Sequence, residues 1–188
     1  FGESEEQSAI REMVRGFAES VLPPTIEHRD KNQIAPVEEW KKFCDETGLQ
    51  GITIAEEYGG FPVDDISEAI IIEELARVDP SFSVFYAVHV GLCSKTITLH
   101  GTDEQKQKYL TQLAADKVGA YSLSEAGAGT DAGALSCKAE LSEDGSHYIL
   151  NGLKMWVTNG ASADFYVLFA KVVGHPDYGG KKQGGTAR

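Results

Sequence analysis

The sequence is most informative in two stretches, Tyr121-Ser-Leu-Ser-Glu-Ala-Gly-Ala-Gly-Thr-Asp131 and Asn151-Gly-Leu-Lys-Met-Trp-Val-Thr-Asn159. The first is a short alternating run that ends in a loop with two glycines. Because glycine has no Cβ, backbone N–H groups in such a loop can approach a ligand closely. We predict that the second stretch contains a strand over residues 154–158. The two-residue repeat of a strand would place its tryptophan and threonine on one face.

These side chains suit one class of ligand. A flat ring beside a hydroxyl (Trp156 and Thr158), opposite a glycine loop flanked by Ser124 and Thr130, fits a planar, hydrogen-bonding cofactor that carries phosphate. A flavin has these properties. An ordinary hairpin with a glycine turn has the same pattern, so both interpretations stay open at this point.

The glycine loop also matches the spacing G-x-G-x-x-A of a dinucleotide-binding turn, through Gly127, Gly129 and Ala132. That fold requires a helix directly after the loop, whose N-terminus holds the pyrophosphate, and then a parallel strand. Residues 134–140 show no helical stripe, and β-turn signals such as Asn151-Gly152 follow. The sequence therefore argues against a nicotinamide dinucleotide fold.

Before residue 119 the chain has the periodicity of helices. Apolar residues recur every three or four positions, and Ser4 with Gln7 forms a capping-box pattern, as does Thr102 with Gln105. The predicted helices cover residues 4–22, 36–48, 65–78, 81–100 and 103–115. We interpret the polar residues 25–35 as a connection. The helix over residues 81–100 is apolar nearly all round, which predicts the buried centre of a bundle.

After residue 118 the pattern changes to that of strands. Short runs rich in β-branched and aromatic residues are separated by turn signals, which predicts consecutive strands of an antiparallel sheet or barrel. These runs cover residues 118–124, 136–141, 147–151, 154–158 and 164–172. The predicted fold class is an all-α helical bundle over residues 1–118, followed by a truncated antiparallel β-barrel over residues 119–173. We expect the glycine-rich, basic residues 174–188 to be disordered.

Composition narrows the functional classes. The 188 residues are 41% hydrophobic and carry a formal net charge of −12 without a basic stripe, so nucleic acid is not an expected partner. No apolar run approaches the roughly 18 residues of a membrane span, and none is expected. No targeting segment is visible in a chain that begins with Phe1. Three widely spaced cysteines argue against a disulfide framework, and five histidines without ligand spacing argue against a metal site.

Five motifs resemble one family, the acyl-CoA dehydrogenases. The two stretches quoted above do so together with Glu56-Glu-Tyr-Gly-Gly60, Glu73-Glu-Leu-Ala76 and His100-Gly-Thr-Asp-Glu-Gln-Lys106, in register over residues 4–173. The Ser-Glu-Ala-Gly-Ala-Gly form, with Val84-Phe85 upstream, looks most like the short/branched-chain members, which act on 2-methyl-branched acyl groups. The resemblance implies the helical N-terminal domain and part of the β-barrel middle domain of that family, with FAD as cofactor.

The resemblance also implies roles for single residues toward the cofactor. Ser124 stands where the family hydrogen-bonds the pyrimidine side of the flavin, Trp156 where it packs against the ring, and Thr158 where a hydroxyl contacts flavin N5. Thr130 replaces a commoner serine that serves both cofactor and acyl-CoA. The implied cofactor-binding residues are Tyr121, Leu123, Ser124, Gly129, Thr130, Trp156, Val157 and Thr158.

For the substrate, the resemblance implies a pocket formed by residues of the helix over residues 81–100. The implied substrate-binding residues are Thr130, Val84, Phe85 and Val88. The bulk of Phe85 would shorten the cavity and favour a short or branched acyl chain, with graded selectivity. The alternative is that Phe85 is simply part of the core.

The family reaction removes the α-proton of an acyl-CoA while hydride leaves the β-carbon for the flavin, giving a trans-2-enoyl-CoA. It needs a carboxylate base, which the family carries on a C-terminal helical domain. We expect neither Glu125, whose place in the motif is structural, nor Asp131, a turn residue, to replace that base. The expected function is thus FAD-dependent dehydrogenation of a short or branched-chain acyl-CoA, with the base missing from this chain. The alternative is a non-catalytic fragment that keeps only helical packing and an interaction surface.

The resemblance further implies partners and a compartment. These are an acyl-CoA substrate, electron-transfer flavoprotein as electron acceptor, a homotetramer, and the mitochondrial matrix, with the cytoplasm as the alternative.

Overall fold

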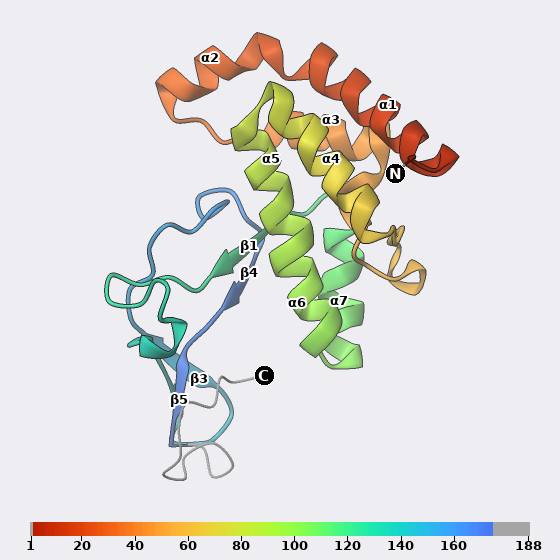
Figure 1. Cartoon of the computed structure of the whole chain (residues 1–188). Coiled ribbons are helices and arrows are strands. Elements are labelled where there is room, and N and C mark those ends of the chain that lie inside the picture. Colours follow the sequence, from red (N-terminus) through yellow and green to blue (C-terminus); the bar gives the residue numbers. More distant parts are fainter. Residues whose placement is uncertain (1, 175–188) are drawn as a thin grey trace. The chain divides into compact units, whose positions relative to one another are not determined.

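The computed structural model describes residues 2–174, which form two compact units (Figure 1). The helical unit contains Phe1–Ala120 and Thr158–Phe165, and the sheet unit contains Tyr121–Val157 and the described residues from Tyr166 on. The division predicted after residue 118 lies close to the first of these boundaries. The structure also assigns residues 158–165 to the helical unit. The predicted disordered tail lies outside the described residues, except for Gly174.

The helical unit follows most of the predicted pattern. Its helices are α1 (Glu5–Val21), α2 (Pro23–Asn32), α3 (Val37–Thr47), α4 (Asp65–Val78), α5 (Pro80–Ala87), α6 (Lys95–His100) and α7 (Asp103–Leu113), with short 3-10 turns η1 (Leu49–Gly51) and η2 (Glu56–Tyr58). Both predicted capping boxes are present, at Ser4 and at Thr102. Each satisfies two backbone N–H donors at the start of a helix through side-chain oxygens, which fixes where α1 and α7 begin.

The interpretation of residues 25–35 as a connection is wrong, because α2 occupies most of them. Pro23 and Pro24 end α1, as predicted, but they also occupy the first positions of α2, where proline's missing N–H costs nothing. The buried residue of α2 is Arg29 rather than an apolar side chain. Apolar periodicity could therefore not reveal this helix.

The long apolar helix is continuous but not regular. Between α5 and α6 lies η3 (Val88–Ser94), a π-helical segment. Its sides are also less uniformly buried than predicted, because Val84, Leu92 and Leu99 are exposed. By length and composition the whole helix, Pro80–His100, is apolar enough to cross a membrane, but half of that window is buried inside the structure, as in the core helix of a soluble protein.

An aromatic cluster forms the core of the helical unit. Trp40 is fully buried, and its ring lies 5.5 Å from that of Phe85 and 4.6 Å from that of His89. Other rings of the cluster belong to Phe17, Phe43, Phe82 and Tyr86. Aromatic pairs at such spacings stabilise the core beyond the burial of their area. This cluster joins α1, α3 and α5.

A buried carboxylate joins α1 to α4, which lie side by side (Figure 1). Glu74 accepts hydrogen bonds from Arg15 at 2.8 and 2.9 Å, from Arg11 at 2.6 Å and from Arg77 at 3.3 Å. The hydrogen bonds from Arg15 and Arg11 lower the pKa of Glu74 to about 2, against the opposing effect of burial. The pair of helices is therefore held by charge as well as by apolar contact.

The sheet unit contains most of the expected short strands, with a different topology, and the single strand predicted over residues 164–172 is divided into two. β2 (Lys138–Leu141) pairs antiparallel with β3 (Tyr148–Asn151), as predicted, but parallel with β5 (Lys171–Val173). β1 (Gly119–Ser122) and β4 (Phe165–Leu168) form a separate two-stranded sheet. The expected purely antiparallel arrangement is thus wrong for β5. The core of the three-stranded sheet is small and consists of Cys137, Ala139 and Ala170, with Val172 packed against it.

Candidate functional site

The first quoted stretch leaves β1 and enters a loop that is closed by one carboxylate. Glu125 is 5% exposed and accepts hydrogen bonds from the Ser136 backbone N–H at 2.6 Å and hydroxyl at 2.5 Å, and from the Cys137 N–H at 3.0 Å. The Lys154 ammonium donates to the same carboxylate at 2.7 Å. Hydrogen bonds from Lys154 and Ser136 lower the pKa of Glu125 to about 2. With four donors on it, Glu125 holds the loop and has little basicity for proton abstraction.

The loop itself presents open backbone. Gly127, Gly129 and Thr130 are exposed. A Cβ added at either glycine would meet nothing within 4 Å, so the space in front of the backbone is free for a ligand. Asp131 accepts a hydrogen bond from the Gly133 N–H at 3.1 Å and precedes the 3-10 turn η4 (Ala132–Ala134). These contacts support its interpretation as a turn residue.

The predicted strand over residues 154–158 is wrong. Residues 152–157 form no regular element, and Trp156 has a left-handed backbone with φ 58°. The alternation of a strand therefore does not place Trp156 and Thr158 on one face. The Trp156 side chain is 86% exposed, which is unusual for so large an apolar ring.

The two quoted stretches nevertheless lie side by side within the sheet unit. The Met155 N–H donates to Ser124 O at 2.9 Å, and Lys154 Nζ donates to Leu123 O at 2.9 Å. The Tyr121 ring lies 5.0 Å from that of Phe169, and its burial raises the pKa of the Tyr121 hydroxyl. The segment that carries Trp156 and Val157 is thus fixed beside Leu123 and Ser124. Sequence reasoning did not assign a role to Lys154, although it lies in the quoted motif.

Gly152 allows a close approach that starts this segment. A Cβ on Gly152 would lie 2.6 Å from Cys137 Cα and 2.8 Å from Cys137 Sγ, and the residue has φ 157°. Only glycine fits this position. The chain can therefore pass directly over Cys137, two residues before Lys154.

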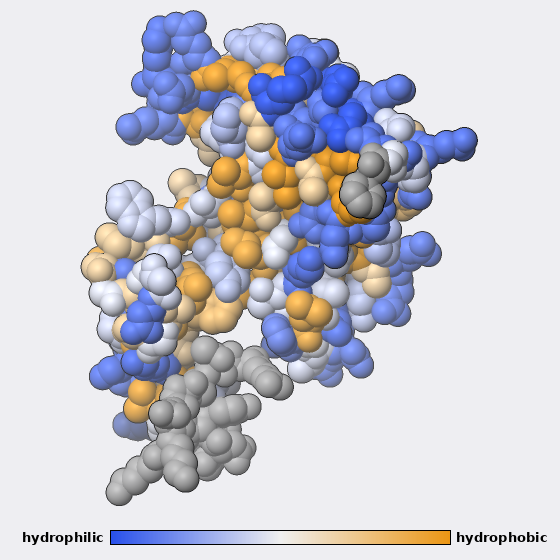
Figure 2. Space-filling model, in the orientation of Figure 1, coloured by the Kyte–Doolittle hydropathy of each residue, from blue (hydrophilic) through white to orange (hydrophobic). Residues whose placement is uncertain are grey.

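The remaining predicted site residues belong to the helical unit. Thr158 is half-buried, Phe85 is 4% exposed and packed in the aromatic core, and Val88 is 8% exposed. Val84 is 51% exposed and lies on the helix over which Figure 2 shows apolar surface. The position of Phe85 agrees with the alternative that it is part of the core. The Phe85 ring lies on the buried side of this helix, whereas Val84 lies on its exposed side.

Asn159, which sequence reasoning left without a role, is the most constrained residue of this part. It is 9% exposed with φ 66°, and its Nδ2 donates to Phe85 O and to Gly119 O, each at 3.0 Å. Its Oδ1 is buried without a hydrogen-bond partner among the described residues. The turn dipeptide Asn159-Gly160 is the sequence signal that could have pointed to it.

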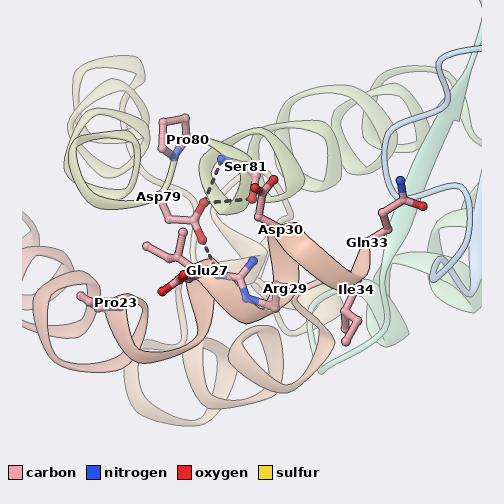
Figure 3. Close-up of a pocket in the computed structure, with 10 residues that line it drawn as sticks. Pro23, Glu27, Arg29, Asp30, Gln33, Ile34, Asp79, Pro80 and Ser81 are labelled. Atoms are coloured by element: carbon pink, nitrogen blue, oxygen red, sulfur yellow. Dashed lines mark hydrogen bonds and ion pairs between the residues drawn. The ribbon is translucent and has the colours of Figure 1, made fainter.

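A pocket of about 660 Å³ lies elsewhere in the helical unit. It is formed by α2 and the junction of α4 and α5, and contains none of the predicted site residues (Figure 3). Arg29 reaches from α2 to Asp79, whose carboxylate also accepts from Ser81. Within this pocket, the charges of Arg29 and Asp79 are thus paired with each other. Among the described residues, no group of three or more His, Cys, Asp or Glu side chains could hold a metal ion.

The residues present fit a flavin. Within the sheet unit, the loop gives free backbone at Gly127 and Gly129, and the segment beside it presents the exposed ring of Trp156. A planar, phosphate-bearing ligand needs such a combination of open backbone, aromatic surface and polar atoms. Ser124 and Thr130 add hydroxyl groups to the same part of the chain.

Comparison with known proteins agrees with this description. Residues 4–117 match the model of the acyl-CoA dehydrogenase N-terminal domain, and residues 120–186 match that of the middle domain. The chain is 44% identical over 171 residues to a short-chain-specific acyl-CoA dehydrogenase of Clostridium acetobutylicum, which covers 90% of this chain and 44% of that protein. It is 40% identical over 168 residues to a mitochondrial isovaleryl-CoA dehydrogenase of Solanum tuberosum, which covers 88% and 40%.

A solved structure is also similar. The crystal structure of an acyl-CoA dehydrogenase from Bacillus anthracis complexed with FAD superposes with a TM-score of 0.85 at 38% identity, over 90% of this chain and 29% of that chain. The chain thus spans less than half the length of each of these three proteins.

Proposed function

Because the chain belongs to the acyl-CoA dehydrogenase family, a family of FAD-dependent enzymes, we propose that it provides the flavin-binding part of an enzyme that dehydrogenates a short or branched-chain acyl-CoA. The observation that carries the proposal is the arrangement within the sheet unit. Glu125 closes the glycine loop, Lys154 ties the second stretch to the first, and Trp156 presents its ring to solvent.

In this proposal the residues of this chain bind and orient the cofactor, and they do not transfer protons. The open backbone at Gly127 and Gly129 accommodates phosphate, while Ser124 and Thr130 offer hydroxyl hydrogen bonds. Trp156 packs on the ring, together with Tyr121, Leu123, Val157 and Thr158. When bound, FAD supplies the electron acceptor for the hydride from the β-carbon.

The proton acceptor is proposed to come from outside these residues. The carboxylate of Glu125, which belongs to the loop, already accepts hydrogen bonds from four donors. The carboxylate of Asp131 accepts a hydrogen bond within a turn. A base must be free to take a proton at the working pH. In this proposal the described residues bind the oxidant, and another segment carries the base.

For the substrate we propose that Val84, Phe85, Val88 and Thr130 contact the acyl group. The exposure of Val84 supports a direct contact with the acyl group, whereas Phe85 and Val88 lie on the buried side of the same helix. The similarity to both a short-chain and an isovaleryl-CoA enzyme supports a short or branched chain. We also propose electron-transfer flavoprotein as the electron acceptor and a homotetramer as the assembly. The plant relative supports a mitochondrial location.

Tryptophan fluorescence tests whether FAD binds at the second stretch. The chain has two tryptophans, and Trp40 is fully buried in the helical unit. We expect FAD to quench the emission of Trp156 in a saturable way, whereas ADP does not. The quenching should be absent in Trp156→Phe, which leaves only Trp40.

A serine variant and its control sharpen the same test. Ser124→Ala is expected to weaken FAD binding about tenfold, which corresponds to one lost hydrogen bond. Ser146→Ala, at an exposed turn of the same unit, should bind FAD as the unchanged chain does. Equal quenching in Trp156→Phe would place the flavin elsewhere and contradict the proposal.

A further inference from the structure

The function proposed above uses only the first residue, Val88, of the π-helical segment η3. π-helical turns are rare and occur often at functional sites. Side chains and backbone from other parts of the helical unit converge on η3 and the turn before it. The contacts are Thr53 Oγ1 to Val90 O at 2.8 Å, Asn159 Nδ2 to Phe85 O at 3.0 Å, His89 Nε2 to Gln50 O at 3.2 Å, and the Gly119 N–H to His89 Nδ1 at 3.1 Å.

One of these contacts and a further hydrogen bond meet at Gly119, the first residue of β1. Its N–H donates to His89 and its carbonyl accepts from Asn159, so both polar groups of its backbone are bound by side chains. A Cβ at this position would lie 2.6 Å from Cys93 Sγ, so only glycine allows the strand to begin this close to the helix. The start of β1 is therefore fixed to η3 by hydrogen bonds and by contact.

Asn159 is the residue that connects these parts. Both acceptors of its Nδ2 are carbonyl oxygens, so the orientation of the amide is determined. Its own carbonyl accepts from the Ser162 and Ala163 N–H groups at 2.9 and 2.8 Å, which holds the turn that follows. The side chain of Asn159, the residue after Thr158, thus joins the helix that carries Val84 and Phe85 to the strand that leads to Tyr121.

We propose that Asn159 is a positioning residue of the helical unit, which fixes Thr158 and the start of β1 relative to the helix that carries Val84 and Phe85; this rests on the proposed function, in which Thr158 contacts the flavin and that helix the acyl group. The Asn159 Oδ1 supports the proposal independently. It is a buried acceptor with no partner among the described residues, which is costly for a residue that only stabilises a core. In place of Asn159, an aspartate would set a carboxylate against two carbonyl oxygens and abolish both hydrogen bonds.

Hydrogen–deuterium exchange of the 188-residue chain tests the connection itself. In Asn159→Asp we expect amides of residues 85–90 and 119–122 to exchange about 100-fold faster, while those of α1 and α4 keep their rates. Thr53→Val is the matched control, because it removes another hydrogen bond to η3 but has no link to Gly119. It should leave residues 119–122 unchanged. Unchanged rates at 119–122 in Asn159→Asp, or a uniform increase in every helix, would overturn the proposal.

FAD binding then separates positioning from general stability. By quenching of Trp156, Asn159→Asp is expected to bind FAD at least tenfold more weakly, whereas Thr53→Val stays within about twofold of the unchanged chain. Equal weakening by both variants would mean that Asn159 acts only through stability. Absence of any quenching in the unchanged chain would count against the proposed function, and the exchange result would still decide the role of Asn159. If Asn159→Asp does not fold, Asn159→Ala, which adds no charge, takes its place with the same expectations.

Discussion

Asp79→Ala is expected to lower the free energy of unfolding of the helical unit by roughly 3–5 kcal/mol, the cost of breaking a buried ion pair from one side. Asp79 is 2% exposed and pairs with the guanidinium of Arg29, which is 6% exposed. Its carboxylate also caps α5 by accepting from the Ser81 N–H at 3.0 Å and the Phe82 N–H at 3.1 Å. Among the described residues, the substitution would leave Arg29 with Glu39, at 3.4 Å, as its carboxylate partner and with the Thr25 hydroxyl at 3.1 Å.

Urea unfolding followed by the emission of Trp40 measures this effect, in a Trp156→Phe background that makes Trp40 the sole tryptophan. Asp64→Ala is the matched control. Asp64 caps α4 in the same way, through the Ile66 and Ser67 N–H groups, but it is exposed and has no buried arginine partner. We expect a much smaller loss for Asp64→Ala. Equal losses in the two variants would show that capping, not the ion pair, accounts for the effect.

The helical unit is also expected to lose about 2 kcal/mol of stability between pH 7 and pH 5 because of one histidine. Burial lowers the pKa of His89 to about 4, from 6.5. The Gly119 N–H donates to its Nδ1, and its Nε2 lies 3.2 Å from Gln50 O, so the neutral ring is the form that fits. Since the pKa is lowered in the folded state, the contribution is full above pH 6.5 and is lost as the pH falls toward 4.

Unfolding in urea at pH 7, 6 and 5 measures the slope. His89→Phe keeps an aromatic ring beside Trp40 and should be less stable at pH 7, with most of the slope removed. His28→Gln alters an exposed histidine and should keep the slope. Carboxylates with lowered pKa, such as that of Glu74, contribute mainly below this range. An unchanged slope in His89→Phe would contradict the assignment.

Local sequence signals predicted the elements whose ends are set by neighbouring residues. The capping boxes at Ser4 and Thr102 fixed the starts of α1 and α7, and Gly48 ends α3 in the left-handed conformation. These signals act over three or four residues and depend little on the rest of the fold.

What sequence reasoning missed depends on distant partners. α2 buries Arg29, and only its pairing with Asp79, fifty residues away, explains why a polar segment is a helix. The π-helical turns of η3 are hidden in an apolar run that fits a regular helix equally well. Trp156 follows an alternating pattern, but the hydrogen bonds of Lys154 and Met155 to Leu123 and Ser124 impose another backbone conformation.

For the candidate site, the motifs identified the glycine loop, and the structure supplied the network that holds it. The position of Glu125 in the motif predicted a structural residue, and its contacts agree with that. Lys154 and Asn159 lie within the quoted stretch, yet no local pattern indicates their partners, which are remote backbone carbonyls and, for Lys154, also the Glu125 carboxylate. The roles of the individual residues toward FAD and acyl-CoA stay predictions.

We propose that the described residues carry the site of the electron acceptor, and that the proton acceptor lies outside them. The most direct test is to purify the 188-residue chain, record its flavin absorption with and without added FAD, and assay turnover on butyryl-CoA, isovaleryl-CoA and 2-methylbutyryl-CoA. We expect weak FAD binding that is lost on gel filtration, and no enoyl-CoA product. A stoichiometric flavin spectrum with turnover of any of these substrates would contradict the claim.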